Sequence, residues 1–178
     1  MKPISEMAQA ELGAHVQSHL RDKGIDVVLS GGAVVAIYTD GKYVSGDLDF
    51  VNRYAIKRSA ITSAMVELGF MEVGRHFEHP DTDFFVEFPP GPLAIGESYQ
   101  IELNELELET GRLVLITPTE CVKDRLAWYY HTGDKQSLYH AVLVANDQHV
   151  DLDEIKKWSE GEGKLEELEK FIEQLDEE

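Results

Sequence analysis

Two aspartates separated by one residue could do chemistry together. Asp47 and Asp49 lie in the run VSGDLDFV, residues 44–51. Alternate residues of a strand point to the same face, so both carboxylates would lie on one side, about 6–7 Å apart. Such carboxylates repel each other unless a cation or hydrogen bonds offset their charge. Hard oxygen ligands at this spacing suit Mg²⁺, which binds carboxylates together with nucleotide phosphates. The pair therefore predicts a magnesium site.

A pair of glycines precedes the aspartates. Gly31 and Gly32 follow a hydrophobic run at residues 26–30 and are separated from Asp47 by fourteen residues. Glycines at the start of a helix let backbone N–H groups approach a phosphate closely. Taken alone, a glycine pair is often a tight turn and an Asp-x-Asp is often a solvated strand end. Their combination in this order is more specific than either part.

Hydrophobic periodicity predicts the elements that position these residues. Strands are expected at residues 26–30 and 44–51, with a short helix between them in the segment AVVAIY. Longer helices are expected at about 5–21, where Ser5 can be the N-cap, and at 56–69. The two glycines and the two aspartates are thus predicted to lie at the ends of neighbouring strands.

The rest of the chain reads first as strands and then as helices. FMEVGRHF, residues 70–77, is expected to pair with TDFFVEF, residues 82–88, and residues 99–109 are expected to form a hairpin with 112–116. Four helices follow, at about 118–130, 134–146, 151–158 and 164–176. The first of them opens with Thr117-Pro118-Thr119-Glu120, which combines an N-cap, a first-turn proline and a capping-box glutamate. This order predicts an α+β fold, with a mixed sheet and a C-terminal helical segment.

The charge of the chain limits its partners. There are 34 acidic and 16 basic residues in 178, a net charge of -18. Thirteen of these net negative charges lie in residues 97–109 and 151–178. This balance argues against a broad basic surface for nucleic acid, which needs clustered Lys and Arg. The remaining residues are nearly balanced, so a small phosphate-binding pocket is compatible with the composition.

Further features of the sequence bear on its setting. Cys121 is the only cysteine, which excludes an internal disulfide. No apolar run approaches the length of about 20 residues that spans a bilayer, and the N-terminal residues have no signal-peptide core. We therefore expect no membrane partner and a cytoplasmic location.

The order of these motifs resembles the signature of a known superfamily. A hydrophobic strand, a Gly-Gly turn, a short helix and an Asp-x-Asp strand are similar to the nucleotidyltransferase superfamily with the DNA polymerase β-like fold. The later stretch TPTECVKDRLAWYYHTGDKQSLYHAVLVA resembles minimal, AbiEii-like nucleotidyltransferases of toxin–antitoxin systems. Arg125-Leu126 and Asp134 stand where that family has a basic residue followed by Leu and a charged turn. The resemblance covers roughly residues 25–147, and the acidic last 30 residues lie outside it. We expect a catalytic core at residues 1–117, with helices on one face of its sheet, and a helical cap with an acidic tail at 118–178.

The resemblance also implies site residues. Family members have a third carboxylate on the strand beside the Asp-x-Asp strand, and Glu87 is our candidate, with Asp83 as the alternative. Asp47 and Asp49 would hold Mg²⁺ on the triphosphate, while Glu87 would ligate a second ion and orient or deprotonate the acceptor hydroxyl. Gly31 and Gly32 would contact phosphate, and either Lys123 or Arg125 would neutralise charge on the leaving phosphates.

The implied function is a Mg²⁺-dependent, two-metal nucleotidyltransferase that moves NMP from an NTP to a hydroxyl acceptor. The family resemblance suggests tRNA as the acceptor, whereas the acidic composition favours a cationic small molecule such as an aminoglycoside. A non-catalytic, antitoxin-like relative that kept the fold is a further alternative. A protein partner such as an antitoxin, or a second copy of this chain, could bind the apolar stripe of the last helix.

Overall fold

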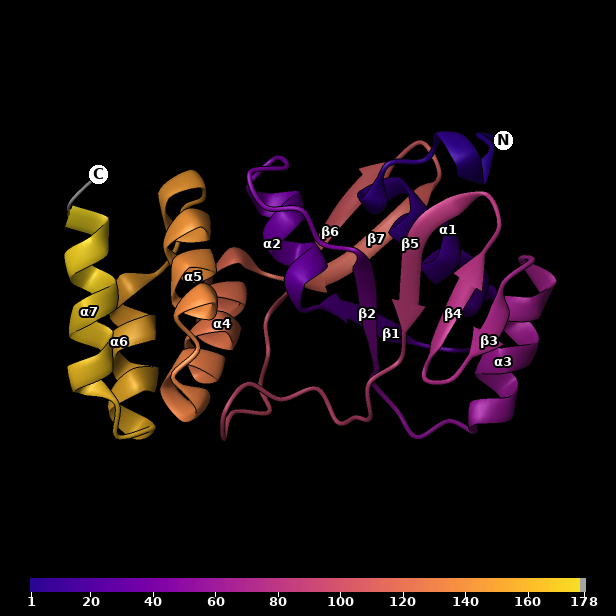
Figure 1. The fold of residues 1–178 in the computed structure, drawn as a ribbon. Helices are drawn as coiled ribbons and strands as arrows, with labels where there is room; N and C mark the ends of the chain where they lie inside the picture. Colours follow the sequence, from indigo (N-terminus) through magenta and orange to yellow (C-terminus); the bar gives the residue numbers. More distant parts are fainter. Residues whose placement is uncertain (177–178) are drawn as a thin grey trace. The chain divides into compact units, whose positions relative to one another are not determined.

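In the computed structural model, which describes residues 1–176, seven strands form one mixed sheet (Figure 1). Their order across the sheet is β3-β4-β5-β2-β1-β7-β6. β2 pairs in parallel with β5, and β1 in parallel with β7, while all the other neighbouring strands are antiparallel. The strands are β1 (Val27–Ser30), β2 (Asp47–Asn52), β3 (Met71–Val73), β4 (His76–His79), β5 (Thr82–Glu87), β6 (Leu103–Leu108) and β7 (Gly111–Ile116).

This sheet and two helices belong to a first compact unit, residues 1–34, 44–93 and 103–116. After a short 3₁₀ helix, η1 (Ile4–Glu6), helix α1 (Gln9–Asp22) packs on β7, β1 and β6. α3 (Arg58–Glu67) packs on α1 and β3. A Cβ atom built on Gly13 of α1 would lie 3.6 Å from Cδ2 of Leu48, so the buried side chain of Leu48 points from β2 toward α1. The helices therefore leave the opposite face of β2 to its polar side chains.

The second compact unit is helical and comprises residues 35–43, 94–102 and 117–178. In it α4 packs on α5 and α6, and α7 packs on α5 and α6. Its helices are α4 (Pro118–Thr132), α5 (Lys135–Asp147), α6 (Leu152–Gly161) and α7 (Leu165–Asp176). α2 (Gly32–Tyr38) joins the two units in sequence. The α+β fold with a mixed sheet and a C-terminal helical segment is thus confirmed, while the division into a catalytic core at residues 1–117 and a helical cap with an acidic tail at 118–178 stays a prediction.

The helix ends follow the chemistry expected from the sequence. The Thr117 hydroxyl accepts a hydrogen bond from the Glu120 N–H at 3.2 Å, with Pro118 in the first turn of α4. The Asp151 carboxylate accepts one from the Glu154 N–H at 3.0 Å at the start of α6. Within residues 1–176, no helix has the length and apolar character needed to cross a membrane.

Some predicted elements differ from the structure, among them the strand predicted at 99–109, which is the shorter β6 (Leu103–Leu108). The first long helix begins at Gln9 rather than near Ser5, and its N-terminal N–H at Ala8 is bound by the Glu11 carboxylate at 2.8 Å. The run FMEVGRHF, predicted as one strand, is a hairpin of β3 and β4. Gly74 adopts a φ of +63° there, which glycine reaches without the steric cost of a side chain. The turn at Gly74 thereby brings Arg75 to the end of the sheet.

Candidate functional site

β2 presents its two aspartates on the face away from the helices. Leu48 and Phe50 are completely buried, whereas Asp47 and Asp49 are half-buried. The start of the strand is held by Gln9 of α1, whose side-chain amide donates to the Asp47 carbonyl at 3.0 Å. The alternation predicted from the sequence therefore places both carboxylates on one face of the sheet.

The glycine turn after β1 lies directly against Asp49. Ser30 and Asp49 are paired residues of the antiparallel β1 and β2, and Gly31 follows with a φ of +75°. A Cβ atom built on Gly31 would lie 2.6 Å from Oδ2 of Asp49. Only glycine satisfies both the backbone conformation and the close approach of the carboxylate. Gly32 is the first residue of α2, a helix of seven residues.

β5 brings a third carboxylate beside the pair. In the parallel pairing of β2 with β5, Glu87 lies opposite Asp49, and Phe85 lies opposite Asp47. Asp83 lies on β5 two residues before Phe85, which is the first residue of β5 that pairs with β2. Asp83 is exposed. Of the two candidates for the third carboxylate, Glu87 is thus the one next to Asp49 on the sheet.

These carboxylates have the donor chemistry of a magnesium site but do not form a closed cage. Among residues 1–176, no three His, Cys, Asp or Glu side chains gather closely enough to hold a metal ion. Mg²⁺ in nucleotide sites is commonly bound by one or two carboxylates, with phosphate oxygens and waters completing the octahedron. Asp47 and Asp49 fit that role by type and position, and the magnesium site stays a prediction.

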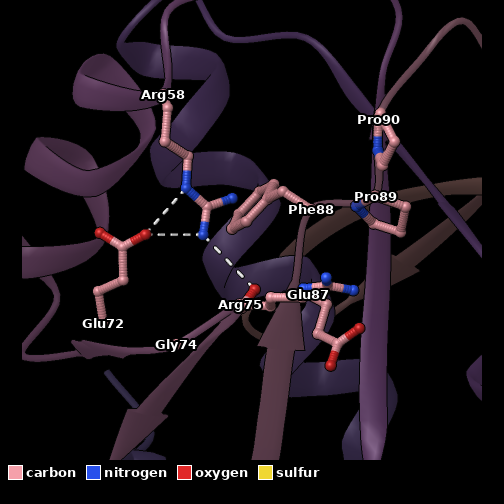
Figure 2. Close-up of a pocket in the computed structure, with 8 residues that line it drawn as sticks. All are labelled: Arg58, Glu72, Gly74, Arg75, Glu87, Phe88, Pro89 and Pro90. Carbon is pink, nitrogen blue, oxygen red and sulfur yellow. Dashed lines mark hydrogen bonds and ion pairs between the residues drawn. The ribbon is translucent and has the colours of Figure 1, made fainter.

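A pocket of about 550 Å³ opens beside Glu87 in the first unit (Figure 2). Its lining comes from the start of α3, the β3–β4 turn and the end of β5, and includes Arg58, Glu72, Arg75, Glu87, Phe88 and Pro89. Sequence reasoning did not identify the two arginines, because neither lies in a motif. The signal available for Arg75 was Gly74, which marks a turn inside a run of alternating residues.

Arg58 is fixed in the pocket wall. Its Nε and Nη2 atoms donate to Oε1 of Glu72 at 3.0 and 2.9 Å. The guanidinium also lies over the ring of Phe77, at 4.9 Å from its centroid. Hydrogen bonds from Arg58 and Thr62 hold the pKa of Glu72 below its ordinary value. The Glu72 charge is therefore already compensated inside the protein.

In the second unit, Lys123 is enclosed by carboxylates. Its side chain is 4% exposed, and Nζ lies 3.1 Å from Oε2 of Glu120 and 2.9 Å from Oε1 of Glu154. Burial raises the pKa of Glu120, although Lys123 opposes that shift. These contacts show a structural ion-pair cluster around Lys123, and its role in binding phosphate stays a prediction.

Arg125 and Asp134 have local partners in the same unit. Nη2 of Arg125 lies 2.5 Å from Oδ2 of Asp124. Asp134 is the N-cap of α5, accepting from the Gln136 N–H at 3.0 Å and from the Ser137 hydroxyl at 2.7 Å. Burial by itself lowers the pKa of Arg125, but the charge and hydrogen bond of Asp124 outweigh it and keep the residue cationic. Its contact with the leaving phosphates also stays a prediction.

Comparisons with known proteins bear on the fold. No family model matches the sequence, and no curated protein is significantly similar to it. Among solved structures, an antigenic nucleotidyltransferase-like protein from Paracoccidioides brasiliensis matches with a TM-score of 0.58 and 14% identity, over 82% of this chain and 78% of that one. The crystal structure of ANT(2'')-Ia in complex with adenylyl-2''-tobramycin matches with a TM-score of 0.53 and 12% identity, over 80% of this chain and 89% of that one.

A solution structure of the antibiotic-resistance factor ANT(2'')-Ia also matches, with a TM-score of 0.51 and 12% identity, over 74% of this chain and 80% of that one. Likeness at this level of identity carries the fold and not the activity. All three solved structures share the fold with this chain over 74% to 82% of its length. The chain therefore has a nucleotidyltransferase-like fold.

Proposed function

We propose that the protein is a Mg²⁺-dependent nucleotidyltransferase that transfers NMP from an NTP to a hydroxyl acceptor. The observation that carries the proposal is the close approach of the Asp49 carboxylate to Gly31, at the end of β1, with Glu87 opposite Asp49 on β5. On a nucleotidyltransferase-like fold, this arrangement places a glycine backbone, an aspartate pair and a further carboxylate along adjoining strand ends.

Each carboxylate has a distinct role in this proposal. Asp47 and Asp49 would hold Mg²⁺, and the ion would supply positive charge to the phosphate oxygens of the bound NTP. Glu87 accepts the proton of the acceptor hydroxyl. The hydroxyl oxygen bonds to the α-phosphorus, the bond from that phosphorus to the bridging oxygen breaks, and pyrophosphate leaves in line. In the two-metal form of the proposal, Glu87 also ligates the second ion.

Two acceptor classes follow from different observations. The solved complex of ANT(2'')-Ia with adenylyl-2''-tobramycin shares the fold and supports a small-molecule acceptor. A tRNA acceptor, the AbiEii-like subtype and an antitoxin partner rest on the sequence resemblance alone. The net charge of -18 disfavours a long RNA-binding track. We therefore rank a small-molecule acceptor first.

A non-catalytic relative of the fold is the second candidate function. It is consistent with the comparisons, because likeness to solved structures at 12% to 14% identity carries the fold and not the activity. A binding module of this kind would retain the sheet and the glycine turn without transferring a nucleotide.

A transfer assay separates these candidates. The protein is incubated with NTPs labelled at the α-phosphate, with Mg²⁺ or EDTA, and with total tRNA, aminoglycosides or sugar phosphates. We expect label in an acceptor only with Mg²⁺, and none with Asp49→Asn. Asp83→Asn is the matched control. Asp83 is an exposed aspartate of β5 that has no pairing partner on β2. Nucleotide binding without transfer to any acceptor would support the non-catalytic candidate.

A further inference from the structure

Two charged side chains of the pocket beside Glu87 have no protein partner in the part of the chain that the structure describes. Among residues 1–176, no hydrogen bond or ion pair is formed by the side chains of Arg75 and Glu87, although both line this pocket (Figure 2). The other two charged residues in the lining, Arg58 and Glu72, are hydrogen-bonded to each other. Arg75 and Glu87 are therefore the groups available to a ligand.

The backbone places these two groups at the same end of the sheet. His76 pairs with Glu87 across β4 and β5, and Arg75 directly precedes His76. The adjoining pair of Val73 with His76 closes the hairpin around Gly74. A turn bounded by paired strands on both sides gives Arg75 a defined position relative to Glu87, despite its exposure.

The unpaired guanidinium of Arg75 favours an anionic group at its side of the pocket. The guanidinium of Arg58 is held against Phe77 and Phe88, at 4.9 and 5.9 Å from their ring centroids, and its charge is balanced by Glu72. Guanidinium groups bind phosphate through paired N–H donors, and such charge-assisted bonds are stronger than neutral ones. A polycation would meet the unpaired guanidinium of Arg75 together with the carboxylate of Glu87.

We propose that this pocket is the acceptor subsite and that it selects a small hydroxyl compound carrying a phosphate group. Arg75 binds the phosphate, and Glu87 faces the hydroxyl that is to be nucleotidylated. The inference rests on the proposed function and names its acceptor class. A volume of about 550 Å³ suits a compound the size of a sugar phosphate, since small-molecule sites commonly measure about 300–1,000 Å³.

Direct binding tests the subsite without requiring turnover. Ribose 5-phosphate, ribose and tobramycin are titrated separately into the full chain, and binding is followed by calorimetry and amide NMR. We expect ribose 5-phosphate to shift amide signals around Gly74 and Phe88, and Arg75→Gln to weaken its binding about 10- to 100-fold. Ribose and tobramycin are expected to leave these signals unchanged.

Arg53→Gln is the matched control. Arg53 is an exposed arginine of the same unit, paired with Asp26 at 3.3 Å. We expect this variant to bind ribose 5-phosphate as the wild type does. Equal binding by Arg75→Gln and the wild type, or equal binding of ribose and ribose 5-phosphate, would overturn the proposal. A single-stranded RNA that occupied the pocket more tightly than ribose 5-phosphate would overturn the small-molecule assignment.

The same protein distinguishes failure of the subsite from failure of the proposed function. Mg²⁺-dependent ATP binding is measured in parallel with the sugar phosphate titration. ATP binding without ribose 5-phosphate binding would overturn the proposal of an acceptor subsite and leave the proposed nucleotidyltransferase function standing. Ribose 5-phosphate binding that depends on Arg75, without any Mg²⁺-dependent binding of NTPs, supports the phosphate pocket and removes the nucleotidyltransferase proposal.

Discussion

Gly31 and Asp49 depend on each other at the scale of single residues. The turn needs a positive φ at Gly31, and the carboxylate of Asp49 fills the space that a side chain would occupy. Two independent physical reasons therefore require glycine at position 31, namely the positive φ of the backbone and the close packing of the Asp49 carboxylate. Only the second of them concerns the candidate site.

The substitution Gly31→Ala separates these two reasons when it is compared with Gly24→Ala. Gly24 has a similar φ of +77°, but a Cβ atom there meets nothing within 4 Å. Both variants should lose about 1–2 kcal/mol of unfolding free energy from backbone strain, measured by denaturant unfolding. Gly31→Ala should in addition weaken Mg²⁺-dependent nucleotide binding, because Asp49 must move. Equal nucleotide binding by the two variants would contradict the role given to Asp49.

The third carboxylate is tested by a pair of variants on β5. We expect Glu87→Gln to retain Mg²⁺-dependent nucleotide binding but to lower transfer to the acceptor by about 10²- to 10⁴-fold, the usual contribution of a general base. Asp83→Asn should leave both measurements unchanged, because Asp83 lies on β5 before the residues of that strand that pair with β2. The reverse result would identify Asp83 as the third carboxylate.

The predictable elements are those in which local pattern and burial agree. Around the candidate site, β1, α2 and β2 follow directly from two hydrophobic runs separated by a glycine turn. β3 was not separated from β4 in the prediction, because its three residues are all exposed and have no inward-facing alternation of their own. Its position depends on tertiary pairing with β4, which a local pattern does not encode.

α5 contains a buried histidine whose ionisation should affect stability. His140 is 5% exposed, and neither ring nitrogen has a hydrogen-bond partner within residues 1–176. Its ring lies 4.0 Å from that of Tyr43. Burial, with a smaller effect of the Arg125 charge, lowers the pKa of His140 below its ordinary value of 6.5, although Asp134 acts in the opposite direction.

A lowered histidine pKa means that the unfolded chain takes up the proton first as the pH falls. The free energy of unfolding should therefore decrease below about pH 6.5, and part of that decrease should disappear in His140→Leu. Denaturant unfolding at intervals from pH 7.5 to pH 5.5 measures both slopes. The same slope in the variant and the wild type would show that protonation of His140 is not coupled to unfolding.

The distribution of charge over the whole molecule has a simple consequence for partners. Thirteen of the eighteen net negative charges lie in residues 97–109, which include β6, and in residues 151–178, which include α6 and α7. β6 is an edge strand, separated from β2 by β1 and β7. The pocket beside Glu87 in the first unit has Arg75 as its unpaired arginine among the described residues, while Arg58 is paired with Glu72. The net charge therefore limits long-range attraction of RNA without excluding a small anionic ligand.

The site was predictable from the sequence only where its chemistry lies in contiguous motifs. Gly31, Asp47 and Asp49 share one supersecondary unit, and the choice of Glu87 agrees with its position opposite Asp49. The pocket beside Glu87 was not predictable, since it assembles Arg58, Arg75 and Phe88 from three segments. The ion pair of Lys123 with Glu154 was also not predictable, because Glu154 comes from a different helix.

Equilibrium binding of nucleotide is the measurement that tests the central claim most directly. The four NTPs are titrated into the wild type and Asp49→Asn, with Mg²⁺ or with EDTA, alongside Asp83→Asn as the control. We predict that the wild type and Asp83→Asn bind at least one NTP only with Mg²⁺, and that Asp49→Asn weakens this binding at least about tenfold without a loss of fold. Absence of Mg²⁺-dependent binding in the wild type, or unaltered affinity in Asp49→Asn, would contradict the account.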